Sequence, residues 1–60
     1  MNIIIYYSES KNNDYIIIYR NHPIKPSKGE LLIINKKYYV VEGVTIDYDN
    51  SNIYVAVRDL

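Results

Sequence analysis

The chain has 60 residues, with seven basic and seven acidic side chains, one histidine, and no cysteine, tryptophan or phenylalanine. This length allows one domain, residues 1–60, which buries only about 60% of the surface that its unfolded chain exposes. The lack of cysteine excludes disulfides and thiolate metal sites, and one histidine excludes histidine clusters, so we expect no cofactor and no metal. Small domains that lack disulfides and bound metals often oligomerise, and we expect a homo-oligomer.

Apolar residues make up 48% of the chain, which is too high a fraction for a disordered protein. The longest apolar run, Ile3 to Tyr7, is far shorter than the ~20 residues that span a bilayer. We therefore expect a soluble cytoplasmic protein with no membrane contact. All eight aromatics are tyrosine and isoleucine dominates the aliphatics, a composition that suits strands but also arises in AT-rich genomes.

Five apolar segments of strand length alternate with polar, turn-rich stretches, and none carries a helical apolar stripe. The predicted strands are residues 2–7, 15–19, 31–34, 37–47 and 53–57. The fold prediction is accordingly all-β.

The first two predicted strands form a hairpin if residues whose numbers sum to 22 face each other. That pairing sets Ile3 opposite Tyr19, Ile4 opposite Ile18, Ile5 opposite Ile17, Tyr6 opposite Ile16 and Tyr7 opposite Tyr15. Both faces of this hairpin are apolar, whereas the strands of a sheet with one solvent-exposed face should alternate between apolar and polar residues. Because 60 residues supply little material to cover both faces, we expect a partner to cover one of them.

The fourth predicted strand changes its alternation at Glu42–Gly43. Strict alternation would bury the Glu42 carboxylate, so we predict a bulge there, with Tyr39, Val41, Val44 and Ile46 pointing inward. The connection from residue 21 to residue 29 contains two prolines and cannot be a central strand. Gly29 is expected to supply a positive φ before the third strand.

A resemblance to a known family rests on the second half of the chain. The run Pro26-Ser27-Lys28-Gly29-Glu30 precedes Leu32 and Ile34, a polar turn, and then Tyr39-x-Val41-x-x-Val44. This pattern resembles small SH3-like barrel proteins, which are often encoded by bacteriophages and mobile elements, over roughly residues 26–57. The resemblance implies a five-stranded small SH3-like barrel with an N-terminal hairpin and a bulged central strand, and a bacterial host cytoplasm if phage-encoded.

No catalytic constellation is recognisable in the sequence, and we predict that the protein is not an enzyme. No glycine-flanked elbow surrounds any serine, and His22 precedes a proline in a loop. The oxygen-bearing side chains of Asp47, Asp49, Asn50 and Asn52 lack the glycine and glutamate of a calcium loop. We expect them to cap a hairpin turn.

The charges are distributed unevenly, since residues 1–40 carry six basic and three acidic groups while residues 41–60 carry one and four. The candidate contacts for an anion or nucleic acid are Arg20, His22, Lys25, Lys28, Lys36 and Lys37. The same asymmetry could steer association with a charged protein, or it could be ordinary surface charge. Zero net charge disfavours nucleic acid, which stays possible.

The tyrosines are the best interaction candidates, because eight of them cannot all be buried with satisfied hydroxyls in so small a core. The expected partner contacts are Tyr6, Tyr38, Tyr54, Ile4 and Ile18. The function predicted is non-enzymatic protein–protein binding by a phage-like or mobile-element protein that inhibits a host or defence protein. The alternatives are nucleic-acid or nucleotide binding through residues 20–37 and a structural role in an assembly.

Overall fold

The structure, a computed structural model, describes residues 1–9, 14–21, 23 and 25–60. Within those residues it contains no helix and five strands: β1 (Asn2–Tyr7), β2 (Tyr15–Tyr19), β3 (Leu31–Ile34), β4 (Lys37–Asp47) and β5 (Asn52–Asp59). All five predicted strands are confirmed. The last one is longer than predicted, because its pairing with β4 continues to Asp59.

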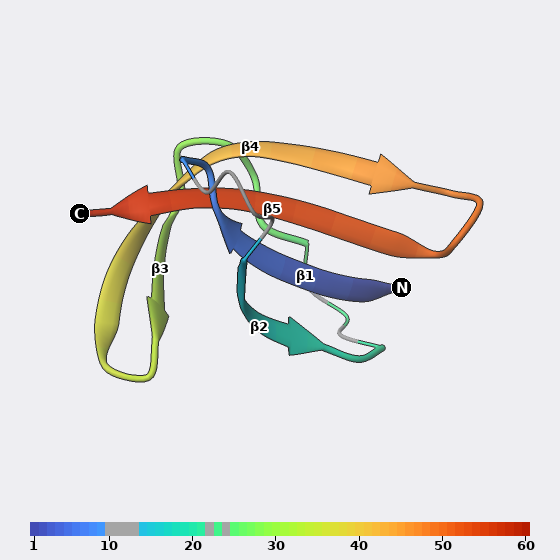
Figure 1. Cartoon of the computed structure of the whole chain (residues 1–60), viewed down its shortest axis with the longest axis horizontal. Coiled ribbons are helices and arrows are strands. Elements are labelled where there is room, and N and C mark those ends of the chain that lie inside the picture. Colours follow the sequence, from blue (N-terminus) through green and yellow to red (C-terminus); the bar gives the residue numbers. More distant parts are fainter. Residues whose placement is uncertain (10–13, 22, 24) are drawn as a thin grey trace.

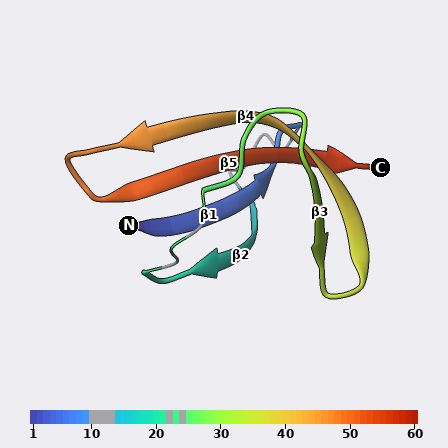
Figure 2. The ribbon, with the colours of Figure 1, turned by 180° about the vertical axis from the view of Figure 1, so that it is seen from behind.

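The strands form one sheet in the order β2-β1-β5-β4-β3, which curls into a half-barrel (Figure 1). The β1–β5 pair is parallel and the other three pairs are antiparallel. Seen from behind, β3 and the first part of β4 turn away from the remaining strands (Figure 2). The predicted all-β class is confirmed, and the half-barrel is compatible with an SH3-like fold.

The predicted β1–β2 hairpin is confirmed in its first half and corrected in its second. Three of the expected pairs are present: Ile3 with Tyr19, Ile4 with Ile18, and Ile5 with Ile17. The register then shifts between Ile5 and Tyr6, so that Tyr6 faces Tyr15 rather than Ile16, and the expected Tyr7–Tyr15 pair is wrong. The cause is a bulge that makes Ile16 the extra residue of β2. Ile16 consequently packs against the core.

The predicted bulge at Glu42–Gly43 in β4 is confirmed. Val41 pairs with Val57 and Gly43 pairs with Ala56, which leaves Glu42 as the extra residue. Its exposed carboxylate lies 3.3 Å from the Arg58 guanidinium. The bulge thus keeps a charge out of the core while Tyr39, Val41, Val44 and Ile46 all contact the core, as expected.

The hydrophobic core lies on one face of the curled sheet. Its buried side chains are Ile3, Ile5, Ile34, Tyr39, Val41, Ile53, Val55 and Val57. They come from β1, β3, β4 and β5, and burial of one such side chain contributes roughly 1.5–3 kcal/mol. We call the opposite face, which carries the intervening residues of β1, β2 and β5, the outer face.

Positive φ values occur in several turns, at Asn21, Gly29, Asn35, Lys36 and Ser51. Gly29 has a φ of 91°, as predicted for the residue before β3. The β3–β4 turn consists of Asn35 and Lys36, with φ values of 50° and 68°. Two successive positive φ values define a type I′ turn, in which glycine usually occupies the second position. Lys36 therefore holds a conformation that is costly for a residue with a β-carbon.

Replacing this lysine by glycine should stabilise the protein. We expect Lys36→Gly to raise the free energy of unfolding by about 0.5–1 kcal/mol. Glycine removes the cost of the left-handed conformation, and part of this gain is offset by the conformational entropy that glycine adds to the unfolded chain. Urea unfolding at neutral pH measures this change. Lys36→Ala is the control, because it removes the charge but keeps the strained φ. Equal stabilisation by both variants would show that the charge, not the backbone, is responsible.

Candidate functional site

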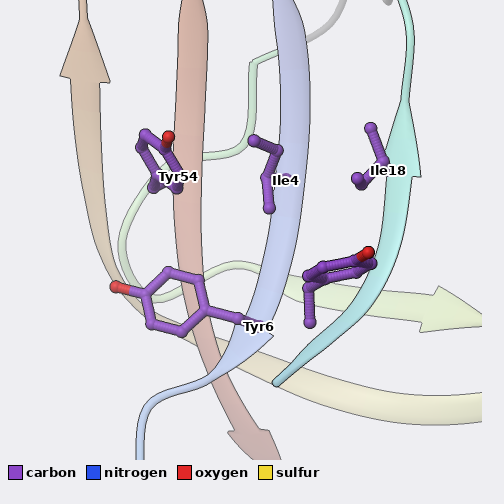
Figure 3. A pocket seen from close by; sticks show the side chains of 5 residues that line it. Ile4, Tyr6, Ile18 and Tyr54 are labelled. Atoms are coloured by element: carbon purple, nitrogen blue, oxygen red, sulfur yellow. The ribbon is translucent and has the colours of Figure 1, made fainter. Parts of the chain in front are cut away.

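The outer face of the sheet carries a pocket of about 450 Å³. Its lining residues are Ile4, Tyr6, Tyr15, Ile18 and Tyr54 (Figure 3). They come from the three adjacent strands β2, β1 and β5. We call this site the tyrosine pocket. Four of its residues are among the five expected partner contacts, so the structure brings most of the predicted set together.

Strand alternation and register explain why these side chains meet. Ile4 and Tyr6 alternate along β1 with the core residues, so they point to the outer face. Ile4 faces Ile18 on one side and Tyr54 on the other, which sets three pocket residues side by side across the sheet. Figure 3 shows these three side chains in a row, with the Tyr6 ring extended from β1 in the direction of β5.

Tyr15 is the pocket residue that sequence reasoning did not assign to the site. The expected pairing set it opposite Tyr7, whose ring contacts Tyr39 in the core. The bulge at Ile16 instead sets Tyr15 opposite Tyr6, on the outer face. Its side chain is 63% exposed, so it forms the rim of the pocket rather than its floor. The run of three isoleucines after Tyr15 contains no signal that would locate the bulge.

A row of hydrogen bonds holds one end of the tyrosine pocket. The Asn52 side-chain amide donates to the Tyr54 hydroxyl at 3.4 Å, and the Asn2 amide donates to the Asn52 carbonyl at 3.4 Å. The backbone N–H of Asn21, which follows β2, donates to the Asn2 side-chain oxygen at 3.2 Å. These contacts link β5, β1 and the end of β2. They position the Tyr54 ring, and none of the described side chains that line the pocket is charged.

Tyr38, the remaining expected contact, lies elsewhere. It is 54% exposed and pairs with Ile33, which is 65% exposed on the neighbouring β3. With Leu31, which is 61% exposed, these residues make a second exposed apolar patch on the β3–β4 hairpin. The structure thus divides the predicted contacts between the tyrosine pocket and this hairpin patch.

The candidate basic residues do not converge on one surface. Arg20 follows β2, Lys25 and Lys28 lie in the connection to β3, and Lys36 lies in the β3–β4 turn. Figure 1 shows the end of β2 and the β3–β4 turn on opposite sides of the molecule. His22 lies outside the described residues. A contact between these residues and a phosphate backbone stays a prediction, and the described basic residues do not form one continuous groove.

Lys37 has a structural environment of its own at one end of the core. Its ammonium donates to the Tyr7 hydroxyl at 3.2 Å and lies 3.2 Å from an Asp59 carboxylate oxygen. It also lies 5.8 Å and 5.6 Å from the ring centroids of Tyr7 and Tyr39. The hydrogen bond to Tyr7 and the contact with Asp59 raise the pKa of Lys37. The ion pair and the hydrogen bond give this lysine partners within the fold.

The two rings beside Lys37 also contact each other. Tyr7 and Tyr39 meet edge to face, with ring centroids 5.9 Å apart, a geometry that aromatic pairs favour. The hydrogen bond with Tyr7, together with burial, raises the pKa of Tyr39. A raised pKa leaves Tyr39 further from ionisation at neutral pH, so the pair is suited to packing rather than to proton transfer.

Asp47, the last residue of β4, caps the turn that follows it, as the sequence predicts. One Asp47 carboxylate oxygen accepts hydrogen bonds from the backbone N–H groups of Asp49 and Asn50, at 3.1 Å and 3.2 Å. The other accepts from the Asn50 side-chain amide at 2.9 Å. Three donors thus stabilise the ionised form and lower the pKa of Asp47, the Asn50 side chain most of all. In the described part of the chain, no three acidic or histidine side chains are grouped to hold a metal ion.

This turn should make stability depend on pH. Because the pKa of Asp47 is lower in the folded state, its contribution is present above the unfolded value near 3.9 and is lost as pH falls through the folded value. We expect Asp47→Ala to lower the urea concentration at the midpoint of unfolding at pH 7. At about pH 2 the midpoints of the variant and of the wild-type protein should be nearly equal.

Two further variants separate the charge from the turn geometry. Asp47→Asn keeps an acceptor for the backbone N–H groups, so it should lose less stability than Asp47→Ala at pH 7. Asp49→Asn changes a neighbouring exposed carboxylate and should leave the acid profile unchanged. An Asp47→Ala deficit of the same size at both pH values would contradict the assignment of the cap.

Comparison of the sequence with protein-family models finds no match, and searches of curated proteins and of solved structures find none either. No described helix is long and apolar enough to cross a membrane. The all-β half-barrel assignment therefore rests on the strands, their pairing and the core. The feature of the structure that bears on function is the tyrosine pocket.

Proposed function

We propose that this chain is a non-enzymatic binding protein that acts by contact with another protein through the tyrosine pocket. The observation that supports this function is the gathering of three tyrosines and two isoleucines from three strands around one pocket on the outer face. Tyrosine is enriched at interface hot spots, because it offers a large contact area and loses little conformational entropy.

The chemistry of the lining defines the partner's contact surface. None of the described residues that line the pocket is charged, so a buried charge from the partner would find no counter-ion among them. Ile4 and Ile18 provide an aliphatic surface, while the tyrosine hydroxyls can exchange hydrogen bonds with the partner's backbone. The pocket thus suits an uncharged aliphatic or aromatic side chain that protrudes from a protein surface.

The more specific part of the proposal rests on the resemblance of residues 26–57 to small SH3-like proteins of bacteriophages and mobile elements. In this version the chain acts in the cytoplasm of a bacterial host and inhibits a host or defence protein by occupying one of its surfaces. A compact chain with an aromatic contact site and no catalytic residue assigned to it is suited to block a partner by binding alone.

Photo-crosslinking tests the pocket directly. A benzoylphenylalanine placed at position 15, on the rim, should crosslink a protein in the native host cell. The same residue at position 48 should not, because Tyr48 is 78% exposed in the β4–β5 turn, outside the pocket. The crosslinked protein is then purified and its affinity for pocket variants is measured.

The affinity measurement decides the proposal. Tyr6→Ala and Tyr54→Ala should each weaken binding by about tenfold or more, as expected for interface hot spots, whereas Tyr48→Ala should change it less than about twofold. Thermal unfolding of each variant shows whether the fold is retained. Equal affinities for all three folded variants would refute the role of the tyrosine pocket.

A further inference from the structure

The tyrosine pocket lies directly beside an open edge of the sheet. It includes Ile18 on β2, the terminal strand, with which only β1 pairs among the described residues (Figure 1). The residues of β2, Tyr-Ile-Ile-Ile-Tyr, include neither the charge nor the proline that commonly blocks the addition of a further strand. A partner that approaches the pocket from this side therefore meets backbone groups as well as side chains.

The backbone directions in β1 follow from its bonds to β5. The Asn2 N–H donates to the Ser51 carbonyl at 2.9 Å, and the Ser8 N–H donates to the Val57 carbonyl at 2.8 Å. Even-numbered residues of β1 therefore direct their backbone groups to β5. Odd-numbered residues direct theirs to β2, because the backbone groups of successive residues in a strand point to opposite sides.

The same alternation identifies the backbone groups at the open edge of β2. Ile5 faces Ile17, and Ile3 faces Tyr19. Since both β1 residues direct their backbone groups to β2, the backbone groups of Ile17 and Tyr19 point back to β1. Ile18 lies between them, so its N–H and C=O point away from β1. In the described part of the chain no strand pairs with Ile18 on that side.

At Ile18 the open backbone groups and the pocket coincide. Its side chain is half-buried on the outer face, where it lines the pocket beside Ile4 (Figure 3). In an antiparallel pair, the side chains of two directly opposite residues lie on the same face of the sheet. A residue of an added strand that exchanges backbone hydrogen bonds with Ile18 thus carries its side chain on the outer face, next to the pocket.

We propose that the partner binds as an extended strand that adds antiparallel to β2, with an uncharged aliphatic side chain opposite Ile18 entering the tyrosine pocket. This inference rests on the proposed function and specifies the form of the partner. Backbone hydrogen bonds with Ile18 contribute affinity that does not depend on the partner's sequence, while the pocket selects the side chain. The bulge at Ile16 interrupts the edge, so regular pairing is confined to the end of β2 around Ile18.

The other open edge of the sheet provides a matched control. The Tyr38 carbonyl accepts a hydrogen bond from the Leu60 N–H at 3.3 Å, so Tyr38 directs its backbone groups away from β3. Ile33, which pairs with Tyr38, consequently directs its own N–H and C=O to the open edge of β3. Ile33 thus matches Ile18 in its backbone but does not line the tyrosine pocket.

A short synthetic peptide tests the inference. Its sequence is Lys-Val-Thr-Leu-Thr-Val-Lys with both ends blocked, so that its alternate residues share a face and the central leucine can enter the pocket. NMR measures how fast each backbone N–H of the protein exchanges with solvent. With peptide bound, we expect exchange at Ile18 to slow by about tenfold or more, because its N–H then donates to the peptide. Exchange at Ile33 should not change.

Two N-methylated peptides separate the backbone contribution from that of the side chain. A methyl group on the nitrogen of the central leucine removes the N–H that donates to the Ile18 carbonyl, and should weaken binding by about tenfold. A methyl group on the following threonine replaces an N–H that points away from β2, and should change the affinity by less than about twofold. Replacing the leucine by alanine should weaken binding to the wild-type protein more than binding to Tyr54→Ala.

Several outcomes would overturn strand addition. They are equal affinities for the two N-methylated peptides, no binding of the parent peptide at millimolar concentration, and slowed exchange at Ile33 in place of Ile18. Slowed exchange at Ile18 that rises with protein concentration in the absence of peptide would assign the edge to a second copy, and would overturn it too. A crosslinked partner that still loses affinity with Tyr6→Ala and Tyr54→Ala would then enter the pocket in another conformation, so the two proposals fail distinguishably.

Discussion

A single five-stranded sheet has two faces, and the described part of this chain builds a core on only one of them. The most completely buried residues, Val55 and Val57, lie on β5, between a parallel neighbour and an antiparallel one. Their alternation partner Tyr54 must then face the other way, as must Ile4 beside it. The tyrosine pocket follows from the same alternation that builds the core, because every inward residue of a central strand has an outward neighbour.

Two bulges interrupt that alternation and so determine which side chains face the core. One of them can be predicted from the sequence and the other cannot. The bulge at Glu42–Gly43 could be predicted because regular pairing would bury a carboxylate without a partner, which costs several kcal/mol. The bulge at Ile16 could not, since shifting one isoleucine past another changes no polarity. Tyr15 was therefore missed, whereas Ile4, Tyr6, Ile18 and Tyr54 were found by their parity within regular segments.

Pairing between distant segments sets a second limit on prediction. Each strand was recognisable from its own residues, and the β1–β2 hairpin was recognisable from its short connection. Nothing local indicates that β1 lies parallel to β5, although this pairing places Tyr54 beside Ile4. The same limit applies to Tyr38. Its outward orientation could be predicted from its own strand, but the residues of β3 that lie beside it could not. Side-chain direction is local information, but the membership of a surface patch depends on the sheet order.

The terminal strand β2 contributes Tyr15 and Ile18 to the tyrosine pocket, and among the described strands it pairs with β1 alone. A β-hairpin strand that pairs on one side only is the part of a sheet most easily frayed. A partner that binds in the pocket would therefore have to order the Tyr15 rim, and this ordering reduces the affinity by the conformational entropy that is lost.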